Sequence, residues 1–302
     1  MAEAESGLFE RGNASVSDEK KAHKLSQVLR GCVRRLSGVC AFAGFDPRRF
    51  VRNFASLPTF IGDMISYTRK RPSRSFRIRL LDCYPILDER TQAAGTVGGA
   101  YFHQDLWAAR KIFRMNPERH FDIGSRIDGF IAHLLVFRPV TVIDIRAIQS
   151  RVEDLTFIQD DATHLSSFAD NSIESISSLH AAEHFGLGRY SDPVDPDACF
   201  KFIHNLQRVL RPGGRLYFSV PIGRERVAFN AHRVFAASTI IERFASLSLL
   251  SFSFVDDAGR LHEAVDAGAA QNAEYGCGLF EFTKGYSSRS QFEPVISAAD
   301  DQ

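Results

Sequence analysis

The sequence His120-Phe-Asp-Ile-Gly-Ser-Arg-Ile-Asp-Gly129 decides the fold. An apolar run ends there in a glycine turn and passes into a helical pattern. Val142-Ile-Asp-Ile-Arg146 follows at the distance of one short helix, and its apolar run meets an acid. This order of strand, turn, helix and strand is typical of a parallel sheet that binds a nucleotide-bearing cofactor across the carboxyl ends of its strands.

The same alternation continues on both sides of this segment. We predict helices over residues 104–115, 128–137, 197–210 and 238–244, the third closed by Pro212-Gly-Gly214. We predict strands that begin near residue 119 and then cover residues 141–145, 156–159, 173–179 and 215–220, with residues 249–255 and 279–283 as a closing pair. Strands that alternate with helices indicate an α/β fold, in which helices cover both faces of a mainly parallel sheet.

The remainder of the chain divides by composition. We predict an α/β domain over residues 101–286, flexible tails at residues 1–21 and 287–302, and a basic, mainly helical N-terminal region over residues 22–100. In that region we expect helix breaks near Gly38, Gly44 and Pro58 and a strand over residues 76–81.

The basic region carries most of the charge asymmetry. Between Lys20 and Arg79, fifteen Lys or Arg stand against Asp46 and Asp63, although the net charge of the whole chain is only +1. Such a region could contact an anionic lipid surface or an acidic partner, or it could be a solvated or internally paired face. A peripheral membrane contact through this region is thus one of the open alternatives, and we do not expect a nucleic-acid partner.

Composition places the chain among soluble globular proteins. Hydrophobic residues make up 44% and charged residues 24%, and five scattered cysteines form no C-x-x-C pair. The chain shows no apolar signal segment and no apolar run of about 18 residues. We therefore expect a cytoplasmic protein with free thiols. The oligomeric state is not predicted.

Three positions at strand ends predict a cofactor site. Gly124 lets a ligand approach the N–H groups at the start of a helix without a Cβ in the way. Asp144, at the end of the second strand, can accept from both hydroxyls of a ribose. Asp161, just past the third strand, can accept from the amine of an adenine, with Asp160 as the alternative. The structural alternatives are a plain turn at Gly124, a helix cap at Asp144 and an Asx-turn at Asp161.

These pieces, in this order, resemble the class I S-adenosylmethionine-dependent methyltransferases. The resemblance covers about residues 118–222 and also includes Asp170-Asn-Ser-Ile-Glu-Ser-Ile-Ser-Ser-Leu-His-Ala-Ala-Glu-His184 and Arg208-Val-Leu-Arg-Pro-Gly-Gly-Arg-Leu216. Further segments are similar to a methyltransferase-like family described only as a domain of unknown function. They are Tyr101-Phe-His-Gln-Asp-Leu106, Glu183-His-Phe-Gly-Leu-Gly-Arg-Tyr190 and Phe229-Asn-Ala-His-Arg-Val-Phe235.

The resemblance implies a Rossmann-like, seven-stranded, mostly parallel sheet whose last strand is antiparallel, with S-adenosylmethionine as the cofactor. It implies that Asp122 and Gly124 face the methionine end of that cofactor. The full set of predicted cofactor contacts is Asp122, Gly124, Ser125, Asp144, Asp161, Ala162 and His180.

One departure from the family lies in the glycine turn. Methyltransferases usually carry a second glycine two residues after the first and often a third two residues later, but here these positions hold Arg126 and Asp128. Arg126 could point outward, contact the cofactor carboxylate, bind an anionic substrate or fill the pocket.

The pattern His180-Ala-Ala-Glu-His184 has a second interpretation. H-x-x-E-H is typical of zinc peptidases, in which two histidines one helical turn apart bind the metal. That chemistry needs a helix through the motif, whereas this segment leaves a predicted strand and runs into Gly186-Leu-Gly188. We therefore predict no metal site.

We predict methylation of a hydroxyl on a small or glycan-like acceptor. Positioning supplies most of the acceleration in such a displacement, and a base that takes the hydroxyl proton adds to it. The candidate bases are His184 first, then His232 and Glu183. The predicted substrate contacts are Arg126, Arg189, Tyr190, Arg224, Asn230 and Arg233.

Two other functions compete with this prediction. One is a catalytically silent methyltransferase-like domain that binds partners or a membrane surface through its basic region. The other is a nicotinamide-dependent oxidoreductase, which the Pro-Gly-Gly turn and the closing strand pair disfavour.

Overall fold

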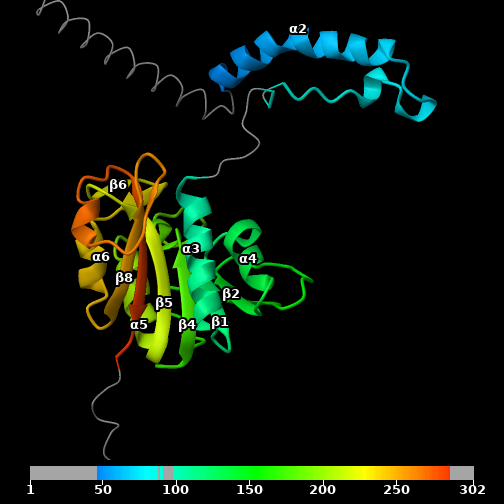
Figure 1. Cartoon of the computed structure of the whole chain (residues 1–302). Coiled ribbons are helices and arrows are strands. Elements are labelled where there is room, and N and C mark those ends of the chain that lie inside the picture. The colour runs from blue at the N-terminus through cyan, green and yellow to red at the C-terminus, as the bar shows by residue number, and fades with distance from the viewer. Residues whose placement is uncertain (1–45, 88, 91–97, 286–302) are drawn as a thin grey trace, which may run out of the picture. The chain divides into compact units, whose positions relative to one another are not determined.

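The computed structural model describes residues 46–87, 89–90 and 98–285 (Figure 1). The chain divides into two units, Met1–Gly95 and Thr96–Gln302. We describe each unit by itself. No helix in the described part of the chain combines the length and the apolar character that a bilayer span requires.

The described part of the first unit is mainly helical. It contains α2 (Pro47–Arg69) and two single turns of 3-10 helix, η1 (Arg74–Phe76) and η2 (Leu80–Asp82). The predicted break at Pro58 is wrong, because α2 continues through that residue. A proline removes one backbone hydrogen bond, and the remaining bonds of this 23-residue helix hold it together. The predicted breaks at Gly38 and Gly44 lie outside the described residues.

The strand predicted over residues 76–81 is also wrong. The segment forms parts of η1 and η2 instead, and the described residues of this unit contain no strand that could pair with it. An alternating pattern becomes a strand only when a partner accepts its backbone hydrogen bonds, since an unpaired backbone gains nothing from the extended conformation.

The second unit contains an eight-stranded sheet in the order β3-β2-β1-β4-β5-β10-β8-β9 (Figure 1). The strands are β1 His120–Ile123, β2 Val140–Asp144, β3 Leu155–Gln159, β4 Ile173–Leu179, β5 Leu210–Ile222, β8 Ser248–Val255, β9 Leu261–His262 and β10 Gly276–Thr283. The first five pair in parallel, and β10 pairs antiparallel with both β5 and β8. The predicted Rossmann-like, mostly parallel sheet with an antiparallel last strand is confirmed.

The predicted count of seven strands is wrong by one. The extra strand, β9, has two residues and pairs with the end of β8 through Phe254 and Val255. Two residues are too short to show a period of two, so the pattern could not predict this edge strand.

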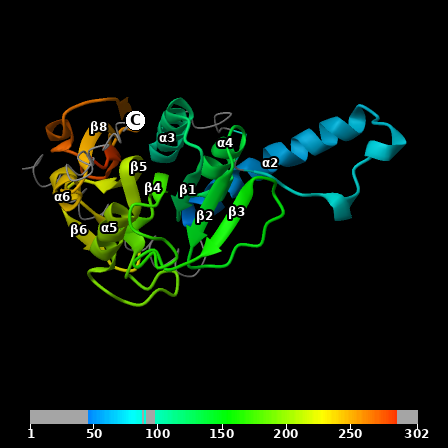
Figure 2. The same ribbon diagram turned by 90° about the horizontal axis from the view of Figure 1, so that it is seen from below.

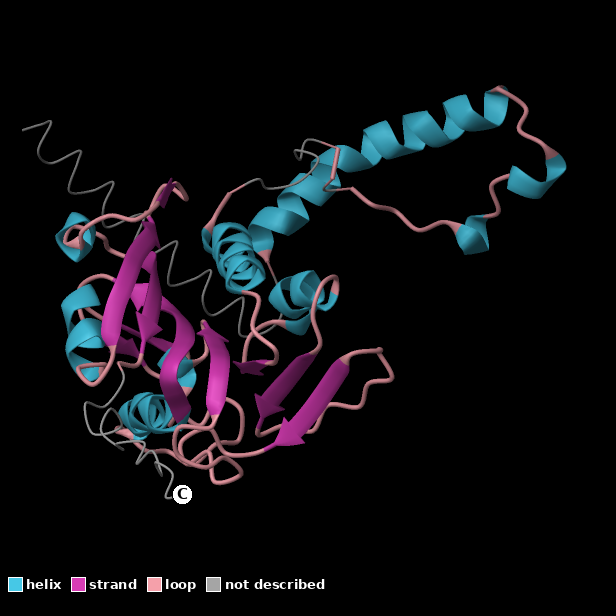
Figure 3. Cartoon of the chain, turned by 60° about the horizontal axis from the view of Figure 1, so that its bottom comes forward, coloured by secondary structure: helices cyan, strands magenta, loops and turns pink. Residues whose placement is uncertain are grey.

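Helices cover both faces of the sheet, as predicted (Figures 2 and 3). On one face lie α3 (Ala100–Met115), the π-helical turn η3 (Ile127–Ile131) and α4 (Ala132–Leu135), which bury side chains that include Trp107, Ile112, Phe130 and Leu134. On the other face lie α5 (Ala198–Val209) and α6 (Ala237–Arg243), which bury Phe202, Leu206, Ile240 and Phe244. Consecutive residues of β5 separate the two cores, because Tyr217 packs on the first face and Phe218 on the second.

Two elements differ from the prediction in detail. The helix predicted over residues 128–137 is η3 followed by the single turn of α4. The strand predicted from residue 215 starts at Leu210, so Pro212-Gly-Gly214 lies within β5. The register against β4 shifts there: Ile173 pairs with Leu210 and Ser175 with Arg215, and the extra residues of β5 bulge out of the ladder.

Candidate active site

The glycine turn after β1 needs a glycine at position 124. Gly124 has φ +70°, and a Cβ added to it would lie 2.9 Å from Cβ of Ala181. A side chain would therefore strain the backbone and push against the segment after β4. The turn brings the ends of β1 and β4 close together.

Asp122 stabilises this turn through hydrogen bonds. Its fully buried carboxylate accepts from the backbone N–H of Ser125 at 3.0 Å, from the Ser125 hydroxyl at 2.6 Å and from the Ser177 hydroxyl at 2.5 Å. Burial raises the pKa of Asp122 to about 6, although these hydrogen bonds lower it. The Ser125 hydroxyl also accepts from the N–H of Leu179, so the two residues tie the turn to β4.

The Arg126 side chain lies beside Asp128 and Tyr101. Its guanidinium pairs with Asp128 at 3.1 Å and lies 5.3 Å from the ring centroid of Tyr101. Arg126 and Asp128 are 53% and 79% exposed, respectively. Of the alternatives that the sequence left open, a side chain that fills the pocket does not match this half-exposed position.

A cavity of about 170 Å³ lies at the carboxyl ends of the parallel strands. We call it the inner cavity. Of the predicted cofactor contacts, Gly124, Asp144, Asp161, Ala162 and His180 line it. Asp122 and Ser125 do not line it. Arg126 does not line it either, so the arginine in the glycine turn leaves the inner cavity open.

Asp144 and Arg146 form a clamp at the end of β2. The Asp144 carboxylate accepts from the backbone N–H of Arg146 at 2.8 Å and from its guanidinium at 2.9 Å and 2.7 Å. The guanidinium also lies 4.6 Å from the ring centroid of Tyr190. A carboxylate offers about four acceptor positions, so the three bonds leave Asp144 able to accept from a further donor.

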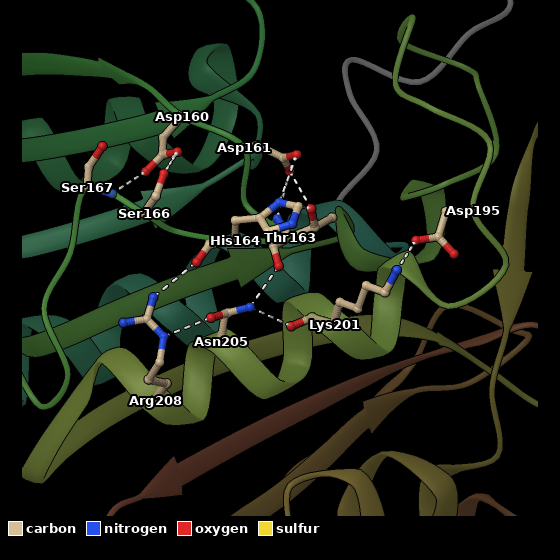
Figure 4. A network of polar contacts seen from close by, with 10 residues as sticks. All are labelled: Asp160, Asp161, Thr163, His164, Ser166, Ser167, Asp195, Lys201, Asn205 and Arg208. Carbon is tan, nitrogen blue, oxygen red and sulfur yellow. Dashed lines mark hydrogen bonds and ion pairs between the residues drawn. The ribbon is translucent and has the colours of Figure 1, made fainter.

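Asp161 is the anchor of an Asx-turn after β3. It accepts from the backbone N–H and the hydroxyl of Thr163, and it lies 3.3 Å from the ring of His164 (Figure 4). Burial raises its pKa, but these hydrogen bonds lower it by more, so the carboxylate stays ionised. Asp160 instead accepts from Ser166 and Ser167, at a distance from the inner cavity.

Helix α5 holds this turn in place (Figure 4). The amide of Asn205 donates to the carbonyl of Thr163 at 2.7 Å. The guanidinium of Arg208 donates to the carbonyls of His164 and Leu165 at 3.0 Å and 2.9 Å. Since backbone carbonyls are the acceptors, the position of Asp161 depends on α5 rather than on the loop sequence alone.

His180, Glu183 and His184 follow the end of β4. Nδ1 of His180 lies 3.2 Å from the Glu183 carboxylate, and its Nε2 lies 3.1 Å from Sγ of Cys277. Burial lowers the pKa of His180, but Cys277 and Glu183 raise it by more, to well above its ordinary value. The second oxygen of the buried Glu183 has no donor within the described structure.

His184 has a fixed tautomer. Its Nδ1 lies 2.6 Å from the carbonyl of Ala231, which can only accept, so Nδ1 carries the proton and the neutral ring presents a free lone pair at Nε2. Burial lowers the pKa of His184. The Glu183 carboxylate lies 3.7 Å from Nε2. These contacts give His184 the properties of a general base.

The zinc interpretation of this segment does not match its conformation. His180 follows β4 with φ +52°, and Ala182–His184 form a single 3-10 turn, η4, instead of an α-helix. Within the described residues, no group of three or more His, Cys, Asp or Glu side chains is arranged to hold a metal ion.

A second cavity, of about 680 Å³, adjoins the first and shares six lining residues with it, Gly124, Asp144, Arg146, His180, His184 and Tyr190. We call it the outer cavity. The predicted bases His184, His232 and Glu183 and the predicted substrate contacts Arg126, Arg189 and Tyr190 all line it. Sequence reasoning missed the contributions of Tyr101, Arg146 and Tyr275. No local pattern marks these residues, which come from separate segments.

The other predicted substrate contacts lie elsewhere. Arg224, Asn230 and Arg233 line neither cavity. Arg233 donates to the carbonyls of Phe185 and Pro196, and the Asn230 amide donates to the carbonyl of Leu187. Asn230 and Arg233 belong to a hairpin formed by β6 (Arg226–Ala228) and β7 (His232–Val234), and their side chains tie this hairpin to the segment after η4.

Comparisons with known proteins agree with the predicted resemblance. The model of a family described as "Caenorhabditis protein of unknown function, DUF268" matches residues 138–266. No curated protein matches the chain.

Three of the similar solved structures have TM-scores below 0.5. The [4+2]-cyclase SpnF is 16% identical, with 64% of this chain and 86% of that chain covered and a TM-score of 0.47. A Burkholderia thailandensis 1,6-didemethyltoxoflavin-N1-methyltransferase, solved with S-adenosylhomocysteine, is 15% identical, with 61% and 79% covered and a TM-score of 0.42. The N-methyltransferase NodS from Bradyrhizobium japonicum, also solved with S-adenosylhomocysteine, is 16% identical, with 62% and 89% covered and a TM-score of 0.43.

The chain is thus similar to a domain family of unknown function over residues 138–266 and, at low identity, to solved structures that include methyltransferases.

Proposed function

We propose that this protein is an S-adenosylmethionine-dependent methyltransferase that methylates a hydroxyl of a small or glycan-like acceptor. One observation carries the proposal: Gly124, Asp144 and Asp161, from the ends of three adjacent parallel strands, line one cavity. Sequential strand ends at one edge of a sheet are where a nucleotide-bearing cofactor binds in open α/β folds.

The residues of the inner cavity fit this cofactor. Gly124 lets the cofactor approach the backbone because it has no Cβ, and Arg126 lies outside the inner cavity. Neither residue would therefore block the methionine end of the cofactor. Asp144 keeps acceptor capacity for ribose hydroxyls beside its bonds to Arg146. Asp161, held by α5, would accept from the adenine amine. When bound, S-adenosylmethionine would supply an electrophilic methyl carbon, whose bond to sulfur breaks as its bond to the acceptor oxygen forms.

His184 would act on the acceptor hydroxyl. Its Nδ1 donates to the Ala231 carbonyl, so Nε2 takes the hydroxyl proton. Its lowered pKa keeps the ring neutral near pH 7 and therefore ready to accept that proton. The Glu183 carboxylate, 3.7 Å from Nε2, stabilises the imidazolium that results.

Calorimetric titration with S-adenosylmethionine and S-adenosylhomocysteine tests the proposal. We expect both to bind the wild-type protein and to stabilise it against heat. Asp144→Ala removes a ribose contact, so its affinity should fall at least tenfold. Glu153→Ala, which removes an exposed acid outside both cavities, should bind as the wild type does. The proposal is wrong if titration of the wild-type protein with either ligand produces no heat of binding and no thermal stabilisation.

A catalytically silent domain that binds an anionic membrane is the second candidate. Val51, Phe54, Ile61 and Ile65 share one face of α2 at helical spacing and are 42–69% exposed. Basic residues surround them in the sequence, among them Arg69-Lys-Arg71. An apolar helix face with neighbouring cations is typical of a helix that lies on a membrane surface.

Liposome sedimentation distinguishes the two candidates. The silent candidate predicts salt-sensitive binding to vesicles that contain phosphatidylserine, weaker binding to phosphatidylcholine alone, and no binding of S-adenosylmethionine. Phe54→Ser together with Ile61→Ser should abolish vesicle binding. Equal binding to both vesicle types, or none, would rule out the anionic membrane as the partner.

A further inference from the structure

The outer cavity contains a guanidinium that no carboxylate of the protein neutralises. Two carboxylates line this cavity, Asp144 and Glu183, and each has its own cation. Asp144 is clamped by Arg146, and Glu183 lies 3.2 Å from Nδ1 of His180. Among the described residues, no carboxylate lies within ion-pair distance of Arg189, which is exposed at the same cavity.

Arg189 is held in place by groups that leave its donors available. One N–H donates to the carbonyl of Ala231 at 3.0 Å, and the guanidinium carbon lies 5.2 Å from the ring centroid of Tyr190. A guanidinium has five N–H donors, so the contact with Ala231 leaves most of them free. The stack on Tyr190 limits the motion of the side chain and so lowers the entropy cost of binding an anion.

The same tyrosine carries a second cation. The guanidinium of Arg146 lies 4.6 Å from the centroid of Tyr190, so two positive groups contact the same ring. Only Arg146 has a carboxylate partner, since Asp144 binds it through both oxygens. An anion bound beside Tyr190 would therefore be attracted by both guanidinium groups. It would also accept from the N–H donors of Arg189 that have no partner in the protein.

The guanidinium of Arg189 lies beside His184, the predicted base. The Ala231 carbonyl accepts from Nδ1 of His184 at 2.6 Å and from Arg189 at 3.0 Å, and the two nitrogens are 3.3 Å apart. A group bound to Arg189 and a hydroxyl that reaches Nε2 of His184 are therefore close enough to belong to one small molecule.

We propose that the outer cavity binds an acceptor in which an anionic group stands beside the hydroxyl that is methylated, and that Arg189 holds the anionic group. A sugar acid and a sugar phosphate share this chemistry. The inference rests on the proposed function for the role of the hydroxyl, but the anion site itself does not depend on the cofactor.

Binding of three matched sugars tests this inference. D-Glucuronate, D-glucose 6-phosphate and neutral D-glucose are titrated into the wild-type protein, with and without saturating S-adenosylhomocysteine, and followed by ligand-detected NMR. We expect at least one anionic sugar to bind at least tenfold more tightly than glucose, since a hydrogen bond between two charged groups is stronger than one between neutral groups. The preferred anion identifies a carboxylate or a phosphate as the group recognised.

Two arginine variants make the test specific. Arg189→Gln keeps a donor for Ala231 but removes the charge, and it should lose at least tenfold in affinity for the anionic sugar with its S-adenosylhomocysteine affinity unchanged. Arg211→Gln, at the opposite end of β5 where Arg211 pairs with Glu174, should match the wild type.

The outcomes separate the two proposals. If glucose binds as well as the anions, if neither anion binds, or if Arg189→Gln binds them normally, the anionic acceptor is excluded. If the anions bind Arg189 but S-adenosylhomocysteine does not bind at all, the anion site stands and the methyltransferase proposal fails.

Discussion

The inner and outer cavities differ in how their walls are built. The inner cavity is lined mainly by residues at or just past the ends of consecutive strands, among them Gly124, Asp144 and Asp161. Most of its polar groups are already bonded within the protein, as the Asp144 clamp and the Asp161 turn show. The outer cavity is lined by Tyr101, Arg189 and Tyr275 from distant segments, and it contains the guanidinium that no carboxylate neutralises.

The difference indicates a division of labour. A wall of satisfied groups on strand ends is rigid, and it suits a ligand that stays the same from one turnover to the next. A wall of loop side chains with unused hydrogen-bonding capacity suits the ligand that sets specificity. Substitutions in the two cavities should therefore have different signatures: loss of cofactor binding in the first, and loss of acceptor turnover with intact cofactor binding in the second.

The largest effect is expected at His184. His184→Asn keeps a donor for the Ala231 carbonyl but removes the lone pair at Nε2, so kcat should fall by about 10²–10⁴-fold. S-Adenosylhomocysteine affinity should change less than threefold. The measurement is methyl transfer to an acceptor that the wild type uses, together with calorimetry.

The pH profile supplies a second test of His184. Burial lowers its pKa, so the wild-type rate should fall with decreasing pH only below the ordinary histidine value of about 6.5. The asparagine side chain of the His184→Asn variant does not titrate in this range, so its residual rate should lack this decline. A variant that keeps the wild-type profile would show that another group is the base.

A smaller but clear effect is expected at Gly124. Gly124→Ala places a Cβ 2.9 Å from Ala181 at φ +70°, so it should destabilise the fold by about 1–3 kcal/mol and weaken cofactor binding. Gly62→Ala is the matched control, because Gly62 lies in α2 with nothing near its missing Cβ. That change should leave stability equal or higher. Urea unfolding measures the stability of each variant, and calorimetry measures its affinity for the cofactor. Equal values for the two variants would contradict the claim that position 124 requires a glycine.

The smallest effect is expected at Arg126. Arg126→Gly introduces the glycine that methyltransferases usually carry, and the loss of the exposed pair with Asp128 should change stability little, because solvent screens exposed ion pairs. Because Arg126 lies outside the inner cavity, cofactor affinity should change less than threefold. A tenfold gain in affinity would mean that Arg126 obstructs the cofactor after all.

Much of the fold could be predicted from local patterns. The five parallel strands and the helices α3, α5 and α6 follow from periods of 2 and about 3.6, which depend only on neighbouring residues. The errors lie where pairing or packing overrides the pattern. Residues 76–81 alternate but have no partner strand, Pro58 sits inside a continuous helix, and β9 is too short to have a period.

The inner cavity could be predicted because the carboxyl ends of parallel strands meet at one edge of a sheet. The order of Gly124, Asp144 and Asp161 along the chain therefore fixes their order in space. Only the tertiary structure could show that Arg126 lies beside Tyr101 and outside the inner cavity. The same holds for the guanidinium of Arg146, which donates to the Asp144 carboxylate, and for the Ala231 carbonyl, which accepts from both His184 and Arg189. These contacts link residues through loops and side-chain rotamers, whose geometry depends on packing across the whole domain and leaves no period in the sequence.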